Sequence, residues 1–197
     1  MTKKWFLVLI FAAFLTTGAF AQARFGVGGG AHLGFGVPTG DWADGDAPTS
    51  FLFGFHLFFD ERFAEASIGL AWDTVSESYM RVTMLTLEIN LLGKIPIDMG
   101  NFSLFPLAGV GLNIPLSDRV SVGSVSVTLS GSDTVLNPSL SLIFGGGADF
   151  YVTERAFIRP ALLFGLNFKP VGSDWWDDMS TVRSFSTRLR VSAGVRF

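Results

Sequence analysis

The sequence contains no cysteine, so neither a disulfide bond nor a thiolate metal site is available to it. Charge is also sparse, with 14 Lys and Arg, 17 Asp and Glu, and a net charge of −3. The cations are scattered along the chain, which excludes the clustered basic surface that a nucleic-acid partner requires. Only 16% of the residues are charged while 49% are hydrophobic, a balance that excludes a disordered chain and predicts one domain with a large buried or lipid-facing surface.

The sequence also has no apolar run that is long enough for a membrane-spanning helix. The run from Trp5 to Leu15 is shorter than the roughly 20 residues of a membrane-spanning helix. It follows a basic start and leads into small residues, a pattern typical of a secretory signal peptide. We predict a cleaved signal peptide over residues 1–21, with residue 23 as the alternative end, and one domain over residues 22–197.

What the chain has, in place of helical periodicity, is alternation with period two. Apolar side chains occupy one parity, and glycine or polar residues occupy the other. The segments with this pattern are 25–37, 51–59, 64–72, 81–95, 102–114, 140–152, 158–168 and 185–197. Each is longer than the ~5–6 residues of a soluble strand and matches a tilted membrane-spanning strand.

The connections between these segments alternate between long and short, as in outer-membrane barrels with long outer loops and short periplasmic turns. An eight-stranded barrel has an interior just wide enough for its side chains. The many phenylalanines would overfill that interior, so we expect the aromatic parity to face outward. The prediction is an all-β fold, an eight-stranded antiparallel up-and-down transmembrane β-barrel, with a soluble barrel as the alternative. Residues 22–197 are thus predicted to form one outer-membrane β-barrel domain. Pro96, Pro106 and Pro160 are expected at bulges or strand ends.

Two further stretches are informative, "LFPLAGVGL" at Leu104–Leu112 and the terminal "AGVRF". With the signal peptide and the alternating strands, they make the chain similar to the small outer-membrane β-barrel proteins of the OmpA-barrel and OmpX kind. The resemblance implies contact with outer-membrane lipids and a monomeric barrel. It also implies that a final strand carrying Val195 and Phe197 is the signal read by the barrel-assembly machinery. Full-length OmpA continues into a peptidoglycan-binding domain, whereas Phe197 is the last residue of this sequence, so we expect no cell-wall tethering of that kind.

Strand registers follow from keeping partners on one face. Closing the turn before Ala156 places Asp149 opposite Arg159 inside the barrel. The same reasoning sets Phe51 beside Trp72 outside, Phe58 beside Glu65 inside, and Glu88 opposite Gly111. The inward parity also contains Arg196. We therefore predict an interior polar network of Glu65, Glu88, Asp149, Arg159, Arg188 and Arg190. This network either plugs the narrow barrel or lines a path for ions or small solutes.

The two histidines are predicted to lie opposite each other inside the barrel, His32 facing His56, with Ser67 beside His56. They are candidates for a metal site, but two ligands are few, and interior packing is the favoured interpretation. We expect no cofactor. Neither histidine lies on the lipid-facing parity and no His-x-Ser motif occurs, so a lipid-modifying enzyme is the less favoured alternative and a non-catalytic protein is expected.

The outer loops are acidic and carry indole side chains. Their candidate surface residues are Asp41, Asp44, Asp46, Asp174, Trp175, Trp176, Asp177 and Asp178. Such loops suit a divalent cation, a basic partner or a host surface, and the alternative is a solvated acidic rim. The Val- and Ser-rich third loop is expected to extend the strands as a hairpin. The resulting hypothesis is an integral outer-membrane protein with structural or interaction and adhesion roles, and a narrow channel is its alternative.

Overall fold

The computed structural model describes residues 25–39, 49–77, 80–122, 125–130, 138–170 and 182–197. The strands are β1 (Gly26–Pro38), β2 (Ser50–Glu61), β3 (Ala64–Glu77), β4 (Met80–Lys94), β5 (Ile97–Asp98), β6 (Phe102–Val122), β7 (Val125–Ser130), β8 (Ser139–Tyr151), β9 (Ala156–Pro170) and β10 (Val182–Arg196). No helix in the described part of the chain is long and apolar enough to cross a membrane.

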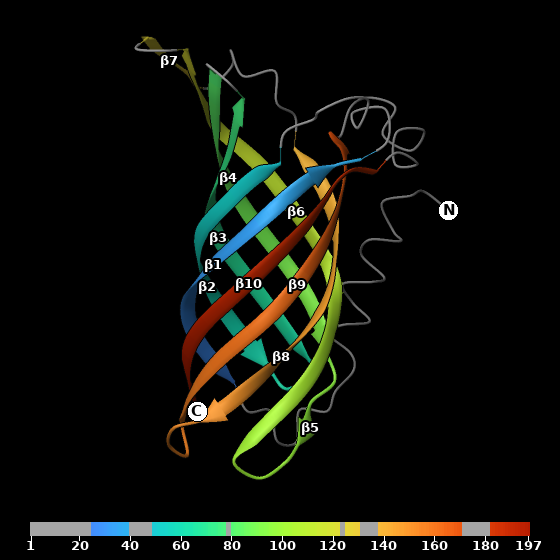
Figure 1. Ribbon diagram of the computed structural model, residues 1–197. Helices are drawn as coiled ribbons and strands as arrows, with labels where there is room; N and C mark the ends of the chain where they lie inside the picture. The colour runs from blue at the N-terminus through green and yellow to red at the C-terminus, as the bar shows by residue number, and fades with distance from the viewer. Residues whose placement is uncertain (1–24, 40–48, 78–79, 123–124, 131–137, 171–181) are drawn as a thin grey trace, which may run out of the picture.

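Eight of these strands close into one antiparallel barrel, which confirms the predicted fold (Figure 1). Their order around the wall is β1, β2, β3, β4, β6, β8, β9 and β10, and pairing of β10 with β1 closes the ring. The two-residue β5 pairs only with the start of β6. Closure leaves no open edge within the barrel wall, which satisfies the backbone of every spanning strand.

The two ends of the barrel differ in their connections. At one end, here called the turn end, β2 joins β3 and β8 joins β9 through a few residues. At the opposite end, the loop end, β6 runs on to Val122 and pairs with β7, Val122 opposite Val125. This projecting hairpin, seen at the top of Figure 1, confirms the hairpin expected in the third loop.

The outer face of the barrel is apolar and aromatic. Phe55 and Leu57 are 53% and 66% exposed although both sit in the middle of a regular strand. In β3 the outward apolar positions run from Ala64 to Trp72, which matches the roughly 9–11 residues that a tilted strand needs to cross a bilayer. The outward parity is therefore the one predicted from the sequence.

Two predicted details of the outer wall are wrong. The ring of Trp72 stacks on Phe53, with centroids 6.1 Å apart, and not on Phe51, because Glu61 still belongs to β2 and the hairpin is two residues longer than expected. The register also continues without a shift at Pro106, opposite Gly146, and at Pro160, opposite Val191, although the β8–β9 ladder is interrupted beside Pro160, between the Gly147–Ala161 and Phe150–Ile158 pairs. Of the three prolines, Pro96 does lie at a strand end, between β4 and β5.

Candidate functional site

The lumen at the turn end is filled by a cluster centred on Arg159 of β9, whose side chain is 0% exposed. Its Nε and Nη2 donate to the two oxygens of Asp149 at 2.5 and 2.9 Å. Nη2 also reaches Asp60 Oδ2 at 2.9 Å, and Nη1 reaches Glu65 Oε2 at 2.6 Å. Three strands besides β9 therefore contribute a carboxylate to one guanidinium, which uses the planar fork of arginine donors fully. We call Arg159, Asp60, Glu65 and Asp149 the Arg159 cluster.

Further cations complete the charge balance of this cluster. Lys94 forms an ion pair with Asp60, and both side chains are buried. Arg196 donates to Asp149 Oδ2 at 2.6 Å and to the hydroxyl of Tyr151 at 2.5 Å. Buried carboxylates are tolerated only where such partners compensate for the loss of hydration.

Three phenylalanine rings enclose the guanidinium. The Arg159 Cζ lies 5.1 Å from the ring centroid of Phe58, 5.1 Å from that of Phe105 and 4.8 Å from that of Phe157. These distances are within the range of cation–π attraction. The interior thus holds aromatic rings as well as the small and polar residues expected from the sequence.

Glycines on neighbouring strands make room for these rings. Gly28 and Gly194 face each other in the register of β1 and β10. A Cβ atom on Gly28 would lie 2.5 Å from Cζ of Phe58, and one on Gly194 would lie 2.6 Å from Cζ of Phe157. The high content of both glycine and phenylalanine in the sequence has this physical basis, since a narrow barrel holds large rings only beside residues without a side chain.

A second layer of polar residues lies nearer the loop end. Arg190 Nη1 pairs with Glu65 Oε1 at 2.7 Å, and Arg188 Nη1 pairs with Glu88 Oε1 at 2.5 Å. The opposite wall is apolar and consists of buried residues of β4, β6, β8 and β9: Leu92, Phe105, Leu107, Ile143, Ala161 and Leu163. Charged and apolar side chains therefore share the lumen, and β4 contributes to both through Glu88 and Leu92.

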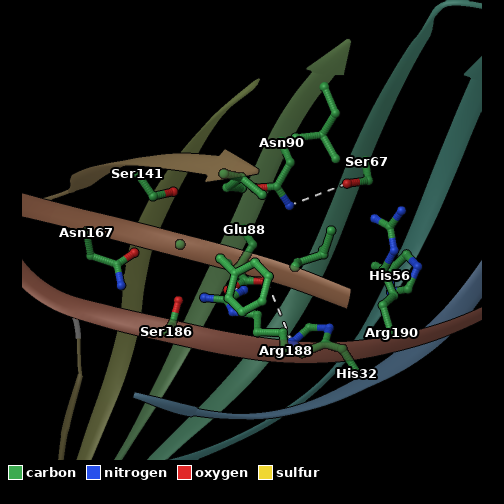
Figure 2. Close-up of a pocket in the computed structure, with 15 residues that line it drawn as sticks. His32, His56, Ser67, Glu88, Asn90, Ser141, Asn167, Ser186, Arg188 and Arg190 are labelled. Atoms are coloured by element: carbon green, nitrogen blue, oxygen red, sulfur yellow. Dashed lines mark hydrogen bonds and ion pairs between the residues drawn. The ribbon is translucent and has the colours of Figure 1, made fainter. Parts of the chain in front are cut away.

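Two cavities occupy the lumen on the loop side of the Arg159 cluster. The smaller, drawn in Figure 2, has a volume of about 30 Å³ and is lined by residues that include His32, His56 and Asn90. The larger has a volume of about 200 Å³ and reaches toward the loop end. Glu88 and Arg188 line both, so their ion pair stands between the two spaces.

The structure places the predicted interior residues Glu65, Glu88, Asp149, Arg159, Arg188 and Arg190 in these layers, but two predicted pairings are wrong by two residues. Glu88 faces Asn113, and Gly111 faces Asn90 instead. Phe58 faces Ser67, and Glu65 faces Asp60. Asp60 and Lys94 were missed as site residues. Both lie on the inward parity at strand ends, which was the available signal, but the segment predicted over residues 51–59 stops one residue before Asp60.

The histidines lie inside the barrel, but not directly opposite each other as predicted. His32 faces Gly54 and His56 faces Gly30, a shift of two residues from the predicted register. Their ring centroids are 6.1 Å apart, and Ser67 faces Phe58 rather than His56. Within the described ranges, no group of three or more His, Cys, Asp or Glu residues is arranged to hold a metal ion.

Each histidine instead has a separate neighbour. His56 Nε2 lies 2.9 Å from Ser192 Oγ, a contact that sequence spacing did not reveal because the two residues are 136 positions apart. His32 Nε2 lies 3.8 Å from Glu88 Oε2. Ser192 is 2% exposed. A Ser–His pair thus exists, but it is enclosed in the lumen.

The remaining predicted residues divide into two groups. Val195 faces outward and is 42% exposed, and Phe197 follows β10 with its N–H donating to the carbonyl of Phe25 at 2.8 Å. The predicted signal peptide lies outside the described residues, and so do all the candidate loop residues: Asp41, Asp44, Asp46, Asp174, Trp175, Trp176, Asp177 and Asp178.

No protein-family model matches the chain, and no curated protein matches it in sequence. Among solved structures, Neisserial surface protein A is similar over 89% of this chain and 99% of its own, at 11% identity and a TM-score of 0.57. A major outer membrane protein from Thermus thermophilus covers 89% of this chain and 99% of its own, at 14% identity and a TM-score of 0.49. The attachment invasion locus protein of Yersinia pestis has the same coverages, 16% identity and a TM-score of 0.45. The first similarity shows that the chain has the fold of a small outer-membrane β-barrel.

Proposed function

We propose that the protein is an integral outer-membrane β-barrel without catalytic activity, a sealed anchor that presents an interaction surface at its loop end. The outward band of exposed apolar side chains supports a lipid environment, because a soluble protein rarely exposes so large an apolar surface. In this proposal residues 1–21 direct export, the barrel-assembly machinery inserts the chain, and the barrel is a monomer in contact with outer-membrane lipids.

The Arg159 cluster is the main observation in support of a barrel whose lumen is closed to ions. The guanidinium is fully buried, contacts carboxylates from three other strands and is enclosed by three rings. An ion that crosses the turn end would have to displace these groups from one another and leave buried charges unpaired. The interior network is therefore assigned a structural role rather than a transport role.

The absence of catalysis is supported by the position of the Ser192–His56 pair. A lipid-modifying site requires the nucleophile and base to face the membrane, whereas this pair is buried in the lumen. In the described part of the chain His56 Nδ1 has no hydrogen-bond partner that would orient the ring as a general base.

The interaction surface is assigned to the loops that join β1 to β2 and β9 to β10. The strands that flank these loops end at the loop end of the barrel, with Pro38 and Ser50 on one side and Pro170 and Val182 on the other. The sequence of both loops combines several aspartates with tryptophan. Acidic loops with indole side chains support binding to a basic partner or to a host surface.

Planar-bilayer recordings on the purified, folded protein test the sealed barrel against the narrow channel. We expect no stable conductance steps. Steps in the wild-type protein that disappear in Arg190→Ala would overturn the sealed barrel and support a channel. A heat-dependent gel shift of protein from the outer-membrane fraction tests the location, and absence of the folded species from that fraction would refute it.

A further inference from the structure

The strands β4 and β6 reverse the polarity of their two faces near the loop end. Closer to the turn end their inward positions include polar side chains, such as Glu88 and Asn113, which pair with each other. Between Leu85 and Thr86 of β4 the register with β6 shifts by one residue. Beyond this bulge the inward positions of the two strands are apolar, with Val82 opposite Val120 and Met80 opposite Val122.

The same reversal extends over the neighbouring strands β3 and β7. We call the parts of β3, β4 and β6 beyond the bulge, together with β7, the rim sheet. Its inward apolar residues are Val75, Met80, Val82, Met84, Val120, Val122, Val125 and Val127. Its outward face is polar and internally hydrogen-bonded, as between Thr74 and Thr83 at 3.3 Å and between Ser121 and Ser126 at 2.9 Å. The apolar face of the rim sheet therefore points toward the barrel axis and away from any lipid.

This inward apolar face is exposed in the described structure. Val122, Val125 and Val127 are 54%, 64% and 52% exposed. Met84 continues the face into the barrel, where it lines the cavity of about 200 Å³. The apolar rim sheet and the polar cavity thus form one surface at the mouth of the barrel.

Two carboxylates lie beside Met84, where the apolar face meets the cavity, and of the two Asp73 lines the cavity. Asp73 and Asp118 flank Met84 in register, on β3 and β6. In each of them Oδ1 is buried and has no hydrogen-bond partner among the described residues. Of the described residues that line the cavity, Arg188 is the cation, and it is engaged by Glu88 at 2.5 Å. The hydroxyl of Ser50 hydrogen-bonds to Asp73, but among the described residues no cation forms an ion pair with either aspartate.

We propose that the mouth of the barrel binds a small amphipathic amine. Its ammonium group lies between Asp73 and Asp118, and its apolar part lies against the valine and methionine side chains of the rim sheet. Strand spacing puts the two aspartate backbones ~10 Å apart, which leaves room for one ammonium group between two side chains. The cavity volume of about 200 Å³ is below the roughly 300 Å³ of ordinary ligand pockets, so the ligand class is small. This inference goes beyond the proposed anchor role, because a sealed barrel can present its loops with or without a ligand in its mouth.

The probe is n-octylammonium, titrated into the full-length protein in lipid nanodiscs and followed by NMR of the methionine methyl groups. Met80 and Met84 belong to the site, whereas Met99 lies at the turn end and is 51% exposed, so it reports general partition into the membrane. We expect saturable shifts of Met80 and Met84 and an unchanged Met99. Octanoate, which has the same chain length and the opposite charge, is expected to leave all three signals unchanged.

Asp73→Asn and Asp118→Asn are each expected to weaken binding at least tenfold, and the matched control Asp98→Asn, at the turn end, is expected to bind like the wild type. Equal shifts at Met99, an equal response to octanoate, or unchanged affinity in both site variants would each overturn the proposal. An absence of shifts would also overturn the proposal. This is the result expected if loops of the chain itself, or a second copy of the protein, cover the rim sheet. The heat-dependent gel shift of the same samples establishes that the barrel is folded, so a failure of binding is distinguishable from a failure of the anchor role.

Discussion

Arg159 and Asp149 face each other across the β8–β9 hairpin and make two parallel hydrogen bonds, Nε to Oδ1 at 2.5 Å and Nη2 to Oδ2 at 2.9 Å. The short turn fixes this geometry, since the Val152 N–H donates to the Ala156 carbonyl at 2.9 Å. Val152 lies three residues after Asp149, and Ala156 lies three residues before Arg159. A bidentate pair of this kind occupies one edge of the planar guanidinium. The remaining donors are therefore aimed across the lumen at Asp60 and Glu65.

Replacement of Arg159 by methionine is expected to destabilise the barrel by about 3–5 kcal/mol, because it leaves buried carboxylates without their shared partner. Urea unfolding in lipid vesicles, followed by circular dichroism and by the heat-dependent gel shift, measures the change.

The matched control is Arg62→Met. Arg62 lies in the turn between β2 and β3, and its Nη2 is 3.9 Å from Asp98 Oδ2, with both side chains more than half exposed. An exposed pair of this kind contributes roughly 0–1 kcal/mol. Equal losses of stability in the two variants would contradict a structural role for the Arg159 cluster.

The β8–β9 pairing could be predicted from the sequence because a short turn leaves few registers that keep apolar residues on one face. The predicted β2–β3 register was wrong by two residues, and the reason is local. Asp60 and Glu61 look like turn residues, but both belong to β2 and the turn is only Arg62 and Phe63. Asp60 was thereby assigned to a loop, and a carboxylate of the Arg159 cluster was lost from the prediction.

The β1–β2 register could not be fixed from the sequence, because a long connection does not constrain which residues meet. His32 accordingly lies two residues away from the predicted register with His56. The reversal of polarity in the rim sheet was also hidden. It depends on a bulge near Leu116, where β6 carries one residue more than β4, and no single-strand pattern specifies a bulge.

Glu65 links the two polar layers, since it accepts from Arg159 at 2.6 Å and from Arg190 at 2.7 Å. Residues that share a buried partner are coupled energetically, by roughly 0.5–3 kcal/mol. We expect the double variant Arg159→Met with Arg190→Met to differ from the sum of the single variants by an amount in that range. Unfolding free energies of the four proteins measure the coupling, and simple additivity would show that Glu65 does not join the layers.

Gly28 and Gly93 make a matched pair for the role of glycine beside the interior rings. A Cβ on Gly28 would lie 2.2 Å from the carbonyl oxygen of Ala193 and 2.5 Å from Phe58 Cζ, whereas the nearest atom to a Cβ on Gly93 is 3.7 Å away. Gly28→Ala is therefore expected to cost about 1–3 kcal/mol by overpacking.

Gly93→Ala is expected to be neutral or stabilising by up to about 1 kcal/mol, because it restricts the unfolded chain without a clash. Urea unfolding of both variants compares them directly. If Gly28→Ala were as stable as Gly93→Ala, the contacts between glycines and rings would not limit packing in the lumen.

The lipid-facing band is tested by two side chains of nearly equal exposure in different surroundings. Leu57 is 66% exposed on the outer wall of β2, and Val125 is 64% exposed on the rim sheet. Arginine on the lipid face of a barrel costs about 2–4 kcal/mol near the bilayer midplane and little outside it. In lipid vesicles Leu57→Arg is therefore expected to lose about 2 kcal/mol of unfolding free energy, while Val125→Arg loses less than about 0.5 kcal/mol. Similar losses at the two positions would mean that both side chains meet the same solvent, and the membrane-spanning assignment of the outer wall would then fail.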